Sequence, residues 1–136
     1  MREEINGKAV INQPAGHWEQ HETLLDAAIR ETREETGYEI ELTDLVGIYD
    51  WTVPDTDLTF LRLCFAGKVI QHHPQQLLDD GIIAAEWMSY DELMQLQDEL
   101  RSPMVLNCVL DHINQHHYPL SLIQSLNSPV ADMQLY

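Results

Sequence analysis

The chain has 136 residues, 44% of them hydrophobic, and a formal net charge of −16. This length suits one domain with one core, so we expect a single domain over residues 1–136, and no apolar run reaches the length of a membrane span. The charge argues against nucleic-acid or anionic-membrane partners, because the surface would repel phosphate groups. No signal-peptide pattern opens the chain, and Cys64 and Cys108 lie in apolar segments, which favours a cytoplasmic protein with reduced thiols.

The first predicted elements are a strand, a loop and a helix. Residues 9–11 form a short strand that runs into a loop over residues 12–16. In the helix that follows, a spacing of three to four residues predicts an inward face at Leu24, Leu25, Ala28 and Thr32. Gly37 stands where a residue in the left-handed conformation commonly ends a helix.

Two strands and two helices are predicted beyond Gly37. A strand lies near residues 45–51, and residues 58–70 give the strongest strand pattern, apolar at both alternations and interrupted by Arg62. After a further apolar segment at 82–88, Ser89 and Glu92 form a capping box that opens a helix to about Leu100.

The last predicted helix begins at Ser102–Pro103 and ends at Tyr118–Pro119. Its buried stripe is predicted at Val105, Val109 and Ile113. The tail past Ser125 is expected to be irregular.

Three carboxylates give the first helix its chemistry. Glu31, Glu34 and Glu35 have the i, i+3, i+4 spacing that places side chains on one helix face. A Glu-rich helix is commonly just a solvated surface, but like charges at this spacing repel one another unless a cation joins them. Hard divalent cations with oxygen ligands, above all magnesium, suit such a cluster.

The spacing of residues 16–38 resembles the Nudix box. Its fixed positions are matched by Gly16, Glu22, Arg30, Glu31, Glu34, Glu35 and Gly37. The box prefers a bulky aliphatic residue where Thr32 stands, and the Thr methyl group can still pack inward. The resemblance implies an α+β or α/β Nudix fold, in which a mixed β-sheet is sandwiched between helices.

Flanking segments resemble a bacterial phosphatase branch of the Nudix superfamily. They are INGKAVINQPAGH, DWTVPDTDLTFLRLCF, EWMS, LRSPMV and HHYPLSLI. This resemblance implies a hydrolase of phosphoric anhydride bonds that removes phosphate from nucleoside di- and triphosphates, thiamine pyrophosphate and its hydroxymethylpyrimidine precursor. The expected partner is therefore a small nucleotide or thiamine-type diphosphate.

The resemblance also implies roles for the box residues. The magnesium ligands, with manganese as a substitute, are expected to be Glu31, Glu34, Glu35 and a backbone carbonyl of Ala15 or Gly16. Arg30 and Glu22 are expected to pair and to orient these carboxylates. The general base stays open between Glu31 and Glu34 in the helix and Asp79 and Asp80 in a loop.

Three further residues are candidates for substrate binding. Gln13 and Arg62 could hold phosphate oxygens, although Arg62 could equally form a surface ion pair. Trp51 could stack on the substrate ring, although a Trp that ends a strand is more often part of the core. His112 and His116 have the spacing of a zinc pair, but without a third ligand we assign them a structural role.

The start of the chain differs from the family pattern. Nudix domains generally place a β-hairpin before the segment that corresponds to residues 8–11, and here that hairpin is apparently missing. A bare strand edge favours pairing between copies, so either a monomer or a homodimer is expected, and an added hairpin should raise stability and substrate affinity. Two other functions stay open: a pyrophosphatase for nucleotide sugars such as ADP-ribose, and a non-catalytic Nudix module that binds a ligand.

Overall fold

The computed structural model describes residues 1–126. Its strands are β1 (Arg2–Ile5), β2 (Lys8–Ile11), β3 (Tyr38–Thr52), β4 (Thr59–His72) and β5 (Ile82–Ala84). Its α-helices are α1 (Leu24–Thr36), α2 (Tyr90–Gln95) and α3 (Met104–Ile113), and short 3-10 helices lie at Gln97–Glu99 and Leu120–Leu122. Among these residues, no helix is both long and apolar enough to cross a membrane.

A hairpin occupies the start of the chain, where we expected none. Strand β1 pairs antiparallel with β2 through a turn at Asn6 and Gly7, whose φ angles of 51° and 77° fit a two-residue hairpin turn. Strand β1 also pairs with β5, so the sheet has the order β2-β1-β5. We expected residues 8–11 to lack the hairpin that usually precedes them; the structure places one strand, β1, before them and makes residues 8–11 the second strand of a hairpin. The Asn-Gly pair was the sequence signal for this turn.

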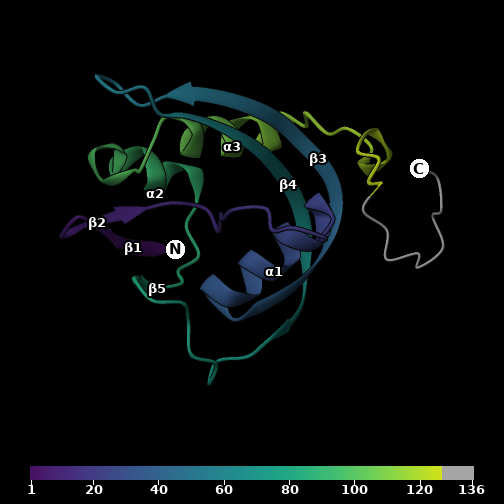
Figure 1. Ribbon diagram of the computed structural model, residues 1–136. Coiled ribbons are helices and arrows are strands. Elements are labelled where there is room, and N and C mark those ends of the chain that lie inside the picture. The colour runs from purple at the N-terminus through teal and green to yellow at the C-terminus, as the bar shows by residue number, and fades with distance from the viewer. Residues whose placement is uncertain (127–136) are drawn as a thin grey trace.

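The second sheet is a long, curved hairpin of β3 and β4. Figure 1 shows this ribbon arching around the other elements, with α1 against its lower part and α3 against its upper part. All pairings between the named strands are antiparallel, and the parallel contact in the described chain is an isolated bridge between Ile11 and Leu100. The sheets are therefore antiparallel rather than mixed.

Helix α1 is capped at both ends. The Thr23 hydroxyl accepts a hydrogen bond from the Asp26 N–H at 3.0 Å, and Gly37 ends the helix with a φ of 76°. The buried positions of the helix are Ala27 and Glu35, not the predicted Leu24, Leu25, Ala28 and Thr32 face, whose side chains are all half-buried. Of the three glutamates, Glu35 therefore turns toward the interior.

The remaining helices are shorter than predicted. The capping box of Ser89 and Glu92 is confirmed, but α2 ends at Gln95 and gives way to the 3-10 turn. Helix α3 buries Met104, Val105 and Cys108, whereas Ile113 is 52% exposed and the helix ends there, well before Tyr118. Most of the tail that we expected to be irregular lies outside the described residues.

The end of α1 offers a test of the fold. A Cβ on Gly37 would meet the His73 carbonyl oxygen at 2.9 Å, whereas one on Gly7 would meet nothing within 4 Å. Both residues have positive φ. We expect Gly7→Ala to lower the free energy of unfolding by about 1 kcal/mol, from backbone strain alone, and Gly37→Ala to lower it by about 2 kcal/mol or more. Chemical denaturation measures both, and equal losses would contradict the close packing at Gly37.

Candidate active site

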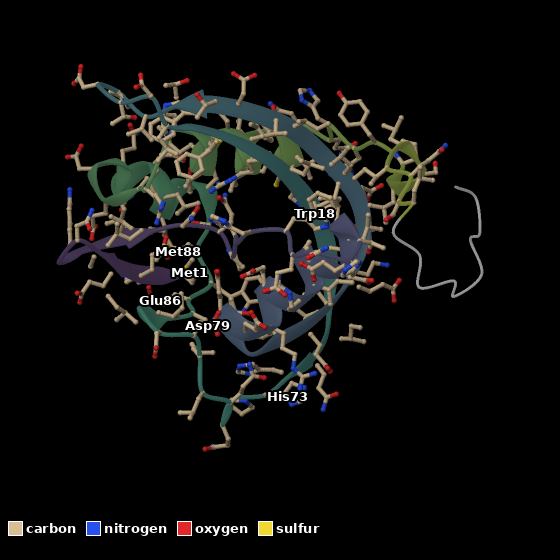
Figure 2. The ribbon with its side chains drawn as sticks, in the orientation of Figure 1. Met1, Trp18, His73, Asp79, Glu86 and Met88 are labelled. Atoms are coloured by element: carbon tan, nitrogen blue, oxygen red, sulfur yellow. The ribbon has the colours of Figure 1, made fainter. Side chains whose placement is uncertain are left out.

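Three carboxylates from two segments converge on one face of α1. Glu31, Glu34 and Asp79 each offer an oxygen, and these oxygens lie within 4.8 Å of one another. Asp79 is positioned by its own backbone, because its N–H donates to the Glu34 carbonyl at 3.0 Å. Figure 2 shows Asp79 beside α1. The sequence had offered Asp79 only as an alternative base, and the structure adds it to the cluster.

Arg30 is the cation that holds this acidic face together. Its guanidinium donates to both carboxylate oxygens of Glu22, at 3.0 and 2.8 Å. The same side chain donates to Glu31 at 2.8 Å and to Glu34 at 3.1 Å. These bonds raise the pKa of Arg30 and hold the pKa of Glu22 below its usual value. The predicted pairing of Arg30 with Glu22 is therefore present, and Arg30 also reaches two members of the carboxylate cluster.

The loop before α1 touches the carboxylates with its backbone. A Cβ on Gly16 would stand 2.0–2.2 Å from the carboxyl atoms of Glu31, a space that only glycine leaves open. One residue earlier, the Ala15 N–H donates to Glu35 at 3.1 Å. The loop thus positions two of the glutamates, which gives a physical reason for the small residues at this point in the sequence.

Glu35 has a different environment from its neighbours. It is 6% exposed, and the structure does not place it with Glu31, Glu34 and Asp79 in the cluster of three. Burial raises the pKa of Glu35 to about 8, the Ala15 N–H opposes this shift, and the charges of Glu31 and Glu3 add to it. In the absence of a cation this carboxyl is therefore protonated at neutral pH.

The candidate substrate residues fall into two groups. Arg62 on β4 donates to the side-chain oxygens of Gln13, at 3.0 Å, and Asn12, at 3.0 Å. Gln13 in turn donates to the Val105 carbonyl at 2.8 Å. Trp51 belongs to neither this network nor the carboxylate cluster and stacks on Phe60, with ring centroids 6.5 Å apart. Sequence reasoning missed Asn12, whose place beside Gln13 was the available signal.

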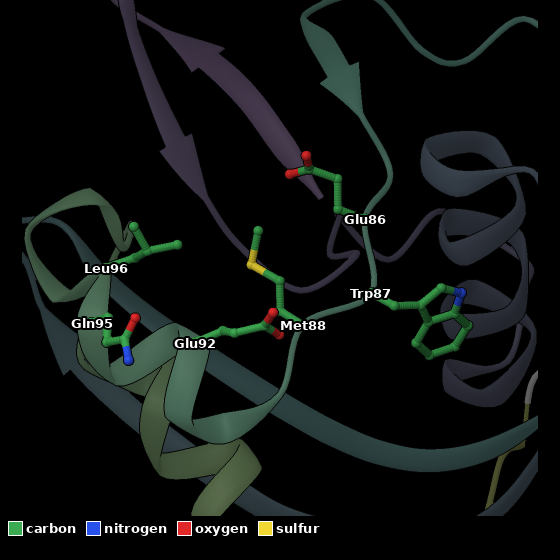
Figure 3. Close-up of a pocket in the computed structure, with 6 residues that line it drawn as sticks. All are labelled: Glu86, Trp87, Met88, Glu92, Gln95 and Leu96. Atoms are coloured by element: carbon green, nitrogen blue, oxygen red, sulfur yellow. The ribbon is translucent and has the colours of Figure 1, made fainter.

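A separate hollow lies between α2 and the segment that follows β5. It has a volume of about 270 Å³, and its lining residues are Glu86, Trp87, Met88, Glu92, Gln95 and Leu96 (Figure 3). Figure 3 shows Trp87 directed toward a neighbouring helix, away from the other lining side chains. None of the three clustered carboxylates lines this hollow, so we do not assign the chemistry to it.

The environment of Glu35 predicts a pH dependence of stability. The folded protein keeps a proton on Glu35 up to about pH 8, whereas the unfolded chain releases it near the ordinary value of 4.5. The free energy of unfolding should therefore fall, by on the order of 1 kcal/mol per pH unit, as pH rises through this window. Glu35→Gln should remove that loss in metal-free buffer, so its advantage over the wild type grows with pH and levels off above about pH 8.

Denaturant titrations at a series of pH values measure this difference. Glu41→Gln is the matched control, because Glu41 is exposed on β3, and it should follow the wild type. Parallel stability curves for Glu35→Gln and the wild type would refute the assigned protonation of Glu35.

Comparison with known proteins shows similarity over most of the chain, beyond the carboxylate cluster. The NUDIX domain model matches residues 2–107. The chain is 40% identical over 129 residues to Phosphatase NudJ of Escherichia coli K12, and the aligned region covers 95% of this chain and 83% of that protein. The Shigella flexneri protein of the same name matches with the same identity and coverage.

A solved structure agrees with these sequence relatives. A NUDIX hydrolase from Nitrosomonas europaea superposes with a TM-score of 0.89 at 39% identity, over 93% of this chain and 87% of that one. The fold, the box and the relatives therefore agree, and the chain belongs to the Nudix hydrolase family.

Proposed function

We propose that this chain is a magnesium-dependent phosphohydrolase that releases phosphate from nucleoside di- and triphosphates and from thiamine-type pyrophosphates. The observation that carries the proposal is the convergence of Glu31, Glu34 and Asp79, with oxygens within 4.8 Å of one another. The name of the relatives, Phosphatase NudJ, supports release of a phosphate group.

The donor set fits a hard divalent cation. All three clustered groups are carboxylates, the ligands that magnesium and manganese prefer. Gly16 leaves its backbone open beside Glu31, where its carbonyl could complete the site. We propose Glu31, Glu34 and Gly16 as ligands together with Asp79. Glu35 would join them on deprotonation, which a nearby cation favours.

The remaining roles in the site are to orient the carboxylates and to accept a proton. When bound, the ion supplies charge neutralisation for the diphosphate and acidification of a water molecule. Arg30 fixes Glu31 and Glu34 through its hydrogen bonds, and Glu22 fixes Arg30 in turn. We propose that one of the clustered carboxylates, Glu31, Glu34 or Asp79, takes the proton of the attacking water; their proximity to one another supports this.

Arg62 and Gln13 are proposed to hold phosphate oxygens. Among the described residues Arg62 forms no ion pair with a carboxylate, and the neutral amides of Gln13 and Asn12 accept hydrogen bonds from it. The net charge of the chain is −16, yet no carboxylate in the described part of the chain neutralises this partly buried guanidinium. It should therefore attract an anion strongly. Trp51 stays a prediction for the ring of the substrate, with its stacking on Phe60 as the competing role.

A substrate panel with magnesium tests this function. We expect inorganic phosphate as the product, whereas a nucleotide-sugar pyrophosphatase would yield two monophosphates and a binding module would yield nothing. Excess chelator should abolish turnover, and Glu34→Gln should lower kcat on the order of a hundredfold or more while the fold survives. Glu41→Gln, a change of the same type at an exposed position, should keep full activity. Full turnover in chelator would exclude the proposed mechanism.

Gly16→Ala tests the contact between the loop and Glu31. The new methyl group would occupy the place of the Glu31 carboxyl, which is the flexible end of a side chain and can move aside without unfolding the protein. We expect an unchanged melting temperature and a kcat lower by about tenfold to a hundredfold, because the carboxylate is displaced by ångströms. A variant with wild-type kcat would show that the position of Glu31 is not critical.

A further inference from the structure

Two imidazoles face each other just past the end of α3. The Nδ1 atom of His112 lies 2.9 Å from the Nε2 atom of His117, and the ring centroids are 5.0 Å apart at an interplanar angle of 29°. Both residues are exposed. We assigned His112 and His116 a structural role from their spacing; the structure turns His116 toward Asp111 and pairs His112 with His117 instead.

The backbone fixes this arrangement. Gln115 takes a φ of 59°, and its N–H donates to the His112 carbonyl at 3.1 Å. Immediately after His117, Tyr118 exchanges two hydrogen bonds with Leu45 of β3, at 2.9 and 2.8 Å. Each histidine is therefore attached to a backbone segment that is held in place, and the two rings meet without a long flexible connection.

The neighbouring groups add order and negative charge. His116 contacts one Asp111 oxygen at 3.2 Å, and the Tyr49 hydroxyl donates to the other at 2.6 Å. Asp111 thus ties the turn to β3. The net charge of −16 raises the local concentration of cations around the whole molecule.

The distance between the two nitrogens suits a shared metal ion. Zinc binds imidazole nitrogen at about 2.0–2.1 Å, so two such ligands at a right angle stand about 2.9 Å apart and at a tetrahedral angle about 3.4 Å apart. The observed 2.9 Å, a hydrogen-bond contact between the two rings, matches the separation that an ion would require, and the ion would replace the shared proton. Both nitrogens become lone-pair donors when the proton of each neutral ring sits on its other nitrogen.

We propose that His112 and His117 form a bidentate site for a divalent transition-metal ion of the zinc class, with water at the other positions. Among the described residues no third His, Cys, Asp or Glu ligand atom joins the pair within 4.8 Å. Nitrogen ligands favour zinc, nickel and copper over magnesium, so this site differs in chemistry from the carboxylate cluster on α1. A bound ion would hold the end of α3 to the segment that pairs with β3.

Isothermal titration calorimetry of the full chain with zinc chloride, in excess magnesium at neutral pH, tests the site. We expect a binding event that His112→Ala and His117→Ala each weaken by about tenfold or more, since loss of even an outer partner of a metal ligand commonly costs that much. Cu²⁺ as a second probe should show coupling to two nitrogens in its electron paramagnetic resonance spectrum. Zinc should raise the melting temperature of the wild type and not of His117→Ala.

Two variants serve as matched controls. His116→Ala removes a neighbouring imidazole that faces Asp111, and Glu34→Gln alters the carboxylate cluster. Both should keep the binding event that His112→Ala and His117→Ala weaken, whatever zinc does at the carboxylate cluster. Absence of that event in the wild type, its persistence in His117→Ala, or its loss in either control would overturn the proposal. The failure of the proposed hydrolase function would leave this result unaffected.

Discussion

Repulsion among carboxylates on one side of α1 is the constraint on which the rest of the site depends. Three glutamates on adjacent turns cannot share one helix face in water without cost. Arg30 offsets part of this cost by bonding to Glu22, Glu31 and Glu34 together. One guanidinium leaves the cluster with a net negative charge. A divalent cation would reduce the repulsion that remains among the carboxylates. The stability of the helix and its capacity for metal therefore have the same electrostatic origin.

Burial divides the glutamates into two kinds. Glu31 and Glu34 keep contact with Arg30, whereas Glu35 points inward, and burial raises the pKa of its carboxyl to about 8. A protonated Glu35 accepts the Ala15 N–H and packs in the core without a charge. The same residue type at adjacent turns thus lies in two different environments, and burial is the main cause of the raised pKa of Glu35.

The sequence predicted the helix and its carboxylates well because spacing along a helix determines which side chains are adjacent. Glu31 and Glu34 needed only that local geometry. The pairing of Arg30 with Glu22, which lies before the helix, was expected from the resemblance to the Nudix box. Asp79 could not be chosen over Asp80 from the sequence, because its place depends on a backbone bond to Glu34 from a distant loop. The orientation of α1 also escaped prediction, since Ala27 and Glu35 are buried by the tertiary packing and not by their hydrophobicity. Strand β1 was missed because its charged residues do not give the apolar pattern of a strand. The Asn-Gly pair that follows it forms the hairpin turn.

The two sheets share no strand pairing among the described residues, so other contacts connect them. The amides of Asn12 and Gln13, which follow β2, bond to Arg62 on β4 and form one such link. An anion bound at Arg62 would compete with those amides for the same N–H groups. Binding would replace hydrogen bonds between the two sheets with hydrogen bonds to the ligand. The bound ligand would then contribute to the contact between the sheets.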